Sequence, residues 1–364
     1  MNRRRFLKTA GALAGAGIAA APLAAPAQTQ NRRQVSMVTC WPRTLSGFSE
    51  AATRIAERIN AASDGRFDVT VYAAGELVPA FEAFDAVASG AAELYHASDD
   101  YWNGTHMAYS FFGGAPAGMT HQEYAAWINW GGGQELWDEV ADQFEIKPFM
   151  AGHTAHTIGG WFTRSIESLN DLRGFKMMLP GMAGEVLRRM GGIAITIPAN
   201  EIRTALKSGG LDGADWAGPW AGMSLGLHEV SKYCAYPGFN GAGIACSMGV
   251  NQRFWRTLTA EDQMIFKAAA AAENDMMASQ FNWQNSVALK TLRDDKSFPV
   301  KQLPKDVQDA FVTAAEDVMM THAARDPLAE RVYDSYIKAR AQLADLSRVT
   351  HEPFTALRNR ADAS

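Results

Sequence analysis

Short β-rich segments alternate with helical segments along the chain, and this alternation constrains the fold more than any other feature. From residue 34 a strand pattern (QVSMVTC), a helical pattern over 46–62 and a second strand pattern (RFDVTVYAAG) follow one another. A helix over 82–89 and a third strand pattern (AAELYHAS) complete a β-α-β-α-β order. This order predicts a parallel sheet covered by helices.

A second α/β set follows the Gly-rich break at 113–118. Its predicted helices span 123–144, 183–190, 201–208 and 261–292, and its strands lie at 146–151, 159–164, GGIAITIPAN and AGIACSMGVN. The tail from Pro304 is mostly helical, and no low-complexity linker or internal repeat interrupts the chain. With 364 residues and domains of about 150 residues each, the sequence predicts an α/β fold of two domains with a cleft between them.

The first 27 residues have the pattern of an export signal. Four basic residues lie within the first eight, a weakly apolar Ala/Gly stretch follows, and 25–27 (APA) offers a small-x-small cleavage site. The order RRRFLK predicts twin-arginine export, with general secretion as the alternative, and cleavage near Ala27 places the mature chain in the periplasm. Loss of those four basic residues changes the net charge from −5 to −9. An acidic chain without basic clusters is a poor candidate for nucleic-acid binding.

Motifs that carry chemistry are weak. The three cysteines have no C-x-x-C spacing, and Cys234 with Cys246 could form a disulfide or stay as two buried thiols. His153 and His156 have a spacing that suits metal ligands on a helix, but their Gly- and Thr-rich surroundings favour ordinary polar histidines. Ser224 lies in a G-x-S-x-G pattern, yet turn residues precede it where a hydrolase elbow needs a strand. An exported α/β chain without a catalytic constellation points to a binding protein.

Aromatic residues in Gly- and Pro-rich contexts are the better candidates for a ligand site. Trp41, Trp102 and Trp216 stand in such contexts, where they would either line a cleft or fill the core under loops. Asp99 and Asp100 precede Trp102. Acids beside tryptophans suit a cation or a polyol, and a solvated turn is the alternative interpretation.

Four stretches resemble the solute receptors of TRAP (tripartite ATP-independent periplasmic) transporters, and the α-keto-acid-binding subgroup in particular. They are GELVPAFEAFDAVASGAAELYHAS, GGWFTRSIESLNDLRGFKMMLPGMAGEVLRRMGG, LKSGGLDGADWAGPW and YCAYPGF. The resemblance covers most of the mature chain. It implies a periplasmic solute-binding fold in which two α/β domains, joined by hinge strands and long helices, close on a ligand, and it implies no enzymatic activity.

The resemblance also implies an organisation and partners. The expected parts are a signal peptide at 1–27, a first domain at 34–152 completed by 248–300, a second domain at 153–247, and a helical region at 301–364. The liganded receptor would deliver its solute to the small and large subunits of a membrane permease. Some relatives dimerise through a C-terminal helix, so a homodimer is expected. A sensing partner of a membrane receptor is a second role that the sequence leaves open.

The implied ligand is a 2-oxo or hydroxy monocarboxylate, held in relatives by an arginine and a cation such as Na⁺ or Ca²⁺. Here Met178 stands at the arginine position, which leaves open a neutral or cationic ligand, because a thioether cannot bind a carboxylate as a guanidinium does. The cation ligands would fall on Thr157, Asp215, Trp216 and Asn240, with Gly241 as an alternative to Asn240. The expected ligand-binding residues are Trp41, Glu76, Asp100, Tyr101, Trp102, His156, Thr157, Met178, Asp215, Trp216 and Asn240.

Overall fold

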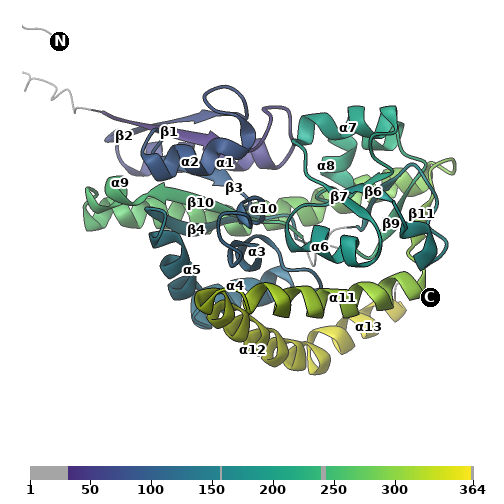
Figure 1. The fold of residues 1–364 in the computed structure, drawn as a ribbon. Helices are drawn as coiled ribbons and strands as arrows, with labels where there is room; N and C mark the ends of the chain where they lie inside the picture. Colours follow the sequence, from purple (N-terminus) through teal and green to yellow (C-terminus); the bar gives the residue numbers. More distant parts are fainter. Residues whose placement is uncertain (1–31, 156–157, 239–242, 362–364) are drawn as a thin grey trace, which may run out of the picture.

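The computed structural model describes residues 32–155, 158–238 and 243–361, and two separate β-sheets organise them (Figure 1). The first sheet has five strands in the spatial order β2 (Phe67–Tyr72), β1 (Arg33–Thr39), β3 (Leu94–Ala97), β10 (Ala245–Asn251) and β4 (Ile146–His153). The second has six, in the order β11 (Val300–Gln302), β9 (Tyr233–Tyr236), β5 (Gly160–Phe162), β8 (Gly213–Ala214), β6 (Lys176–Met178) and β7 (Ile193–Ile195). The predicted two-domain α/β class is confirmed.

Helices surround both sheets. They are α1 (Phe48–Ala62), α2 (Ala83–Ser89), α3 (Tyr109–Gly113), α4 (His121–Trp130), α5 (Gly133–Asp142), α6 (Gly181–Arg189), α7 (Ala199–Ser208), α8 (Pro219–Ser224), α9 (Gln252–Arg256), α10 (Ala260–Asp294), α11 (Lys305–Ala323), α12 (Pro327–Val349) and α13 (His351–Ala361). Four 3₁₀ turns, η1 (Ala80–Glu82), η2 (Asp99–Trp102), η3 (Leu169–Leu172) and η4 (Leu227–Glu229), lie between them.

One prediction about elements is wrong, and another is right only for the first three strands. The helix predicted over 123–144 is two helices, because Gly132 adopts a left-handed φ of 83° between α4 and α5. The first sheet is mixed and not parallel. β1 pairs in parallel with β2 and β3, but β10 runs antiparallel to both β3 and β4. β10 returns to this sheet after the chain has passed through the second one, and this return reverses its direction.

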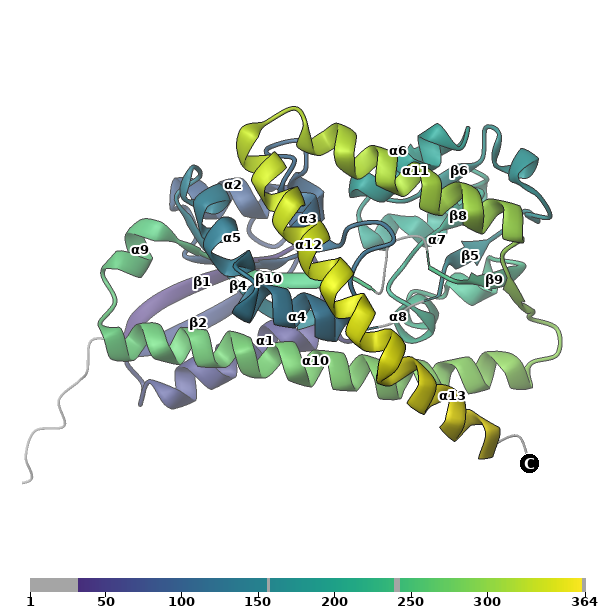
Figure 2. The ribbon, with the colours of Figure 1, turned by 90° about the horizontal axis from the view of Figure 1, so that it is seen from below.

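Helix α10 spans both halves of the molecule (Figure 2). It packs on β4 and α1 beside the first sheet and on α8 beside the second. At its start, Thr259 caps the helix by accepting a hydrogen bond from the Asp262 amide. At the junction of α1, α8 and α10, Gly47 has a φ of 85°, and a Cβ there would lie 2.5 Å from Phe281 and 2.8 Å from Trp220. A residue larger than glycine at this position would push the three helices apart.

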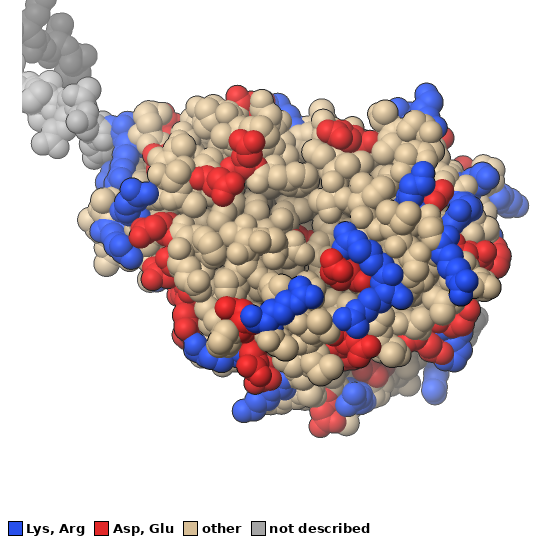
Figure 3. Space-filling model, in the orientation of Figure 1, with Lys and Arg blue, Asp and Glu red and all other residues tan. Residues whose placement is uncertain are grey.

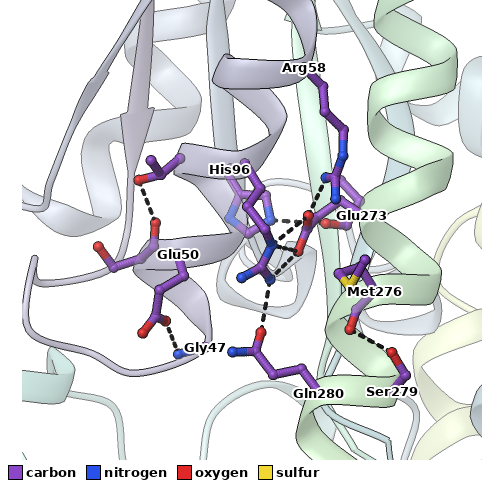
Figure 4. A network of polar contacts seen from close by, with 12 residues as sticks. Gly47, Glu50, Arg58, His96, Glu273, Met276, Ser279 and Gln280 are labelled. Carbon is purple, nitrogen blue, oxygen red and sulfur yellow. Dashed lines mark hydrogen bonds and ion pairs between the residues drawn. The ribbon is translucent and has the colours of Figure 1, made fainter.

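A buried ion network ties α1 to α10 (Figure 4). Glu273 has no exposed side-chain surface, and it accepts hydrogen bonds from Arg54 and Arg58, which are one quarter exposed. Arg54 Nη2 also donates to Gln280 Oε1 at 2.9 Å. The shared carboxylate satisfies two guanidinium groups that would otherwise repel each other.

Three chain crossings connect the sheets, one after β4, one before β10 and one along α10, which leads from β10 to β11. The described ends of the first two crossings pair with each other, because the Thr154 amide donates to the Ile244 carbonyl at 3.0 Å and the Ile244 amide donates to Thr154 Oγ1 at 2.8 Å. The C-terminal helices add a brace: α11 packs on α6, and α12 packs on α3, α4 and α5. Tyr336 of α12 accepts from the Met119 amide at 2.9 Å. The paired crossings and the C-terminal helices therefore fix the two sheets relative to each other.

Candidate functional site

A small pocket lies between the two halves of the molecule. Its cavity volume is about 10 Å³, and it is lined by residues from both sides: Asp100, Tyr101, Leu179, Pro180, Asp215, Trp216, Ala217, Gly243 and Ile244. Asp100 and Tyr101 belong to η2, which follows β3 of the first sheet. Leu179 and Pro180 follow β6, and Asp215 to Ala217 follow β8, both in the second sheet. The face drawn in Figure 3 is mostly uncharged between the two halves, with Lys, Arg, Asp and Glu side chains around that area.

Asp99 and Asp100 are both buried, so the solvated-turn interpretation is wrong. Asp99 accepts hydrogen bonds from Trp137 Nε1 at 2.8 Å, from Tyr95 Oη at 3.3 Å and from Ser247 Oγ. Burial nevertheless raises its pKa to about 7. Asp99 thus anchors η2 to its own domain and leaves Asp100 on the pocket side of the turn.

Asp100 is 3% exposed, and its Oδ1 has no hydrogen-bond partner within the described part of the chain. Burial raises the pKa of this carboxyl group, against the opposing effect of the nearby Ser98 side chain and backbone amides. An ionised carboxylate in such a place is costly unless a cation or a donor reaches it. Asp100 is therefore a functional-site candidate on physical grounds.

Asp215 and Trp216 face the same pocket from the second domain. The Asp215 amide donates to the Met178 carbonyl at 3.1 Å, which fixes the turn after β8 against the end of β6. Trp216 is 2% exposed, and its buried Nε1 meets no hydrogen-bond acceptor among the residues that the structure describes. The pocket therefore offers a carboxylate acceptor on one wall and an indole donor on the other.

Four of the predicted site residues do not line this pocket. Trp41 is fully buried behind Tyr101, with 6.2 Å between their ring centroids, and its Nε1 donates to His96 Nδ1 at 2.9 Å. Trp102 packs against Phe84 and Tyr95. The other two are Glu76, which forms an ion pair with Arg43, and Met178, which is fully buried at the end of β6. The two residues after Met178 reach the pocket in its place.

Three further predicted residues, His156, Thr157 and Asn240, lie outside the described residues, as does Gly241. Sequence reasoning missed five lining residues, namely Leu179, Pro180, Ala217, Gly243 and Ile244. These are apolar or small, so no chemical signal marks them. The Pro180-Gly181 pair in the sequence indicates where strand β6 ends. Ligands of α/β proteins commonly bind at the carboxyl ends of strands, so this pair is the signal that could have pointed to Leu179 and Pro180.

No Lys or Arg lines the pocket in the described residues. Arg43 pairs with Glu76, Lys147 with Asp138, and Arg164 lies 4.0 Å from Asp212. Lys176 Nζ donates to the Gly209 carbonyl at 3.1 Å. The basic residues nearest in sequence to the site motifs are thus engaged elsewhere, and the described pocket has no guanidinium or ammonium group to offer an anion.

The other chemical motifs do not form sites. Cys40, Cys234 and Cys246 are buried free thiols. Ser224 Oγ donates to the Ala221 carbonyl at 2.8 Å, an ordinary helical contact. His153 Nδ1 accepts from the Ala155 amide at 2.9 Å. Across the described ranges, no three His, Cys, Asp or Glu side chains gather as a metal site, and no helix is both long and apolar enough to cross a membrane.

Comparison with known proteins identifies the family. Residues 38–326 match the family model of the bacterial extracellular solute-binding proteins, family 7 (DctP). The chain belongs to this family. It is accordingly a solute receptor of a TRAP transporter and not an enzyme, so the hydrolase alternative that rested on Ser224 is wrong. Receptors of this family are extracytoplasmic, bind small ligands and work with a membrane permease.

Three relatives refine this assignment. A monocarboxylate 2-oxoacid-binding periplasmic protein of Nostoc sp. PCC 7120 is 35% identical over 315 residues, which are 86% of this chain and 85% of the relative. A receptor from Bordetella bronchiseptica RB50, a dimer with copurified calcium and picolinate in one site, is 28% identical, with a TM-score of 0.89 over 91% of this chain and 98% of that one. A receptor from Pseudoalteromonas atlantica T6c with bound sodium and pyruvate is 30% identical, with a TM-score of 0.86 over 89% and 99%.

Proposed function

We propose that this receptor binds a 2-oxo monocarboxylate, with pyruvate as the simplest example, together with a metal cation in the pocket between its domains. The observation that carries the proposal is the pocket itself. It holds two carboxylates and no Lys or Arg among its described residues, so an anion needs a cation to enter. The names of the Nostoc relative and of the pyruvate-bound structure support the ligand class.

The donors present fit a hard cation. Carboxylate oxygens are ligands that Na⁺ and Ca²⁺ accept, and Asp100 supplies a buried Oδ1 to which no described residue donates. Asp215 offers a second carboxylate, and Thr157, Trp216 and Asn240 remain the other proposed ligands. The described residues supply too few acidic ligands for a complete site. The bound acid, backbone carbonyls and water would therefore have to complete the coordination.

In this proposal the two domains recognise different parts of the ligand. Trp216 Nε1 donates a hydrogen bond to the ligand carboxylate, and Leu179 with Pro180 packs against the ligand's apolar end. Tyr101 closes the pocket from the first domain. The pocket excludes bulk water, which strengthens each of these polar contacts. Met178 lies directly under this wall and would set its shape without bonding the carboxylate.

A thermal-shift titration tests the proposal. We expect pyruvate with CaCl₂ or NaCl to raise the melting temperature, and the Asp215→Asn variant to lose most of that shift. A matched control is Glu76→Gln, which removes an acid that lies outside the pocket and is paired with Arg43. If pyruvate and longer 2-oxo acids leave the melting temperature unchanged with every cation, the ligand class is refuted.

A neutral or cationic ligand is the second candidate, and the same two carboxylates beside Trp216 favour it. The titration therefore includes polyols and quaternary amines. A shift with an amine that needs no metal would decide for this candidate.

We further propose that 1–27 is a twin-arginine signal removed on export, and that the domains are 34–152 with 248–300 and 153–247. The helical region 301–364 would carry a homodimer contact, because α13 and the end of α12 expose Leu346, Val349, Phe354 and Leu357. Light scattering should give a dimer for the mature chain and a monomer after truncation at residue 349. A monomeric mature chain would refute the dimer.

Delivery to the small and large permease subunits completes the proposed role. Uptake of labelled pyruvate by vesicles that carry the permease should require this receptor. Uptake that proceeds equally without it would favour the sensing role.

A further inference from the structure

The two carboxylates of the pocket come from different domains. Asp100 lies in η2 after β3 of the first sheet, and Asp215 lies after β8 of the second. They are 3% and 8% exposed, and both line the same small cavity. A group held by both residues would therefore connect the domains across the pocket.

Asp100 is the residue whose surroundings are incomplete. Its neighbour Asp99 has equal burial but accepts hydrogen bonds from three side chains of its own domain. Asp100 Oδ1 is buried and has no hydrogen-bond partner among residues 32–155, 158–238 and 243–361. Buried charges are normally paired or bind metal ions, and the described residues leave this oxygen free to meet a cationic or donating group in the pocket.

The surroundings of Asp100 supply only a partial positive charge. Gly181, the first residue of α6, lies against it, and a Cβ at Gly181 would be 3.5 Å from Asp100 Oδ2. The N-terminus of a helix carries about half a positive charge, which is too little for two carboxylates. The two internal gaps in the described residues contain no Lys or Arg in their sequence, and His156 is their one titratable base.

Charge arithmetic then distinguishes the cations. Metal binding requires deprotonated carboxylates, so the two aspartates and one monocarboxylate would together bring three negative charges into the pocket. A monovalent cation leaves two of them uncompensated, whereas a divalent cation leaves one. Mg²⁺ retains several waters and needs near-octahedral geometry, while Ca²⁺ accepts irregular sets of oxygen ligands. A small pocket with carboxylates on opposite walls therefore suits Ca²⁺ best.

We propose that Asp100 is a specificity-determining residue that makes this receptor select Ca²⁺ over Na⁺ by joining Asp215 across the domain interface. The inference builds on the proposed function, because it concerns the cation that accompanies the acid. It also makes a claim of its own, since Ca²⁺ alone should bind before any acid is added.

Calorimetric titration of the full mature chain, stripped with a chelator, tests the inference. Ca²⁺ and Na⁺ are titrated separately into wild type, Asp100→Asn and Asp99→Asn, without any organic acid. Because Coulomb energy scales with the charge of the ion, a change that weakens Na⁺ binding about 10-fold should weaken Ca²⁺ binding about 100-fold. We expect this pattern for Asp100→Asn. Asp99→Asn should keep the wild-type ratio of the two affinities within about threefold, since its partners belong to its own domain.

Stability without metal provides the second readout. Asn removes an unpartnered buried charge, so metal-free Asp100→Asn should melt at or above the wild-type temperature, whereas a purely structural aspartate would melt lower. Asp100→Ser serves as the second variant should the amide perturb folding. Ca²⁺ affinity within about twofold of wild type in both Asp100 variants overturns the proposal, as does tetramethylammonium binding that depends on Asp100 and is indifferent to Ca²⁺. Loss of pyruvate binding with Ca²⁺ binding intact refutes only the proposed ligand.

Discussion

Replacing Glu273 by Gln should destabilise the receptor far more than its conservative chemistry suggests. Glu273 has no exposed side-chain surface and is the shared acceptor for Arg54 and Arg58. The amide keeps one acceptor oxygen but turns an NH₂ group toward two guanidinium groups, and it removes the only charge that compensates them in this network. Removing one partner of a buried ion pair costs about 3–5 kcal/mol. Because both arginines are about one quarter exposed, we expect the lower end, about 3 kcal/mol.

A matched control lies on the same helix. Glu261 also pairs with an arginine, Arg66, but its side chain is 79% exposed and the closest N–O distance is 3.4 Å. Glu261→Gln should cost at most about 1 kcal/mol. Urea unfolding of wild type and both variants, followed by circular dichroism, gives the free energies and the slopes that verify comparable unfolding. Equal effects of the two substitutions, or a Glu273 effect that disappears in high salt, would refute the argument from burial.

Two other perturbations have clear expected outcomes. Burial lowers the pKa of His96 to about 4, and the Trp41 bond to Nδ1 leaves Nε2 to donate to the Ala151 carbonyl at 3.1 Å. Because the folded-state pKa of His96 lies below the unfolded value of about 6.5, the buried neutral imidazole contributes its full stabilisation above about pH 6.5. The unfolding free energy falls by up to about 3 kcal/mol as the pH drops to about 4. The raised pKa of Asp99 changes stability in the opposite direction over the same pH range, so the wild-type curve alone is not diagnostic. The measured quantity is therefore the unfolding free energy of wild type minus that of His96→Asn, and this difference should shrink as the pH falls. A difference that does not change with pH would contradict the assignment. Gly113→Ala should cost about 1–3 kcal/mol and weaken ligand binding, because its Cβ would lie 2.3 Å from the Asp100 backbone nitrogen. Gly104→Ala, with nothing within 4 Å, is its control in a melting experiment.

The regular elements could be predicted because periodicity and breakers are local signals. The helix over 261–292 is α10 within two residues at each end, and the strand and helix patterns of the first 90 residues correspond to β1, α1, β2 and α2. The direction of β10 could not be predicted, because it depends on where the chain returns after a second sheet. The break at Gly132 was open to prediction from three consecutive glycines.

The site was harder to predict for a physical reason. Asp99 and Asp100 are adjacent in sequence, yet one is satisfied by Trp137 and Ser247, which are 38 and 148 residues away, and the other faces the pocket. Only tertiary packing separates a structural acid from a binding one. Met178 was singled out as a departure from a family pattern, and the structure places it under the pocket wall formed by the next two residues.

Native mass spectrometry of the receptor purified without added ligand tests the central claim most directly. The pocket is closed and bears two carboxylates, so a ligand that copurifies should remain bound. The account predicts a bound mass that corresponds to a small 2-oxo monocarboxylate plus one calcium ion, with both lost together on chelation. A bound organic amine without metal, or an acid that stays bound after chelation, would contradict it.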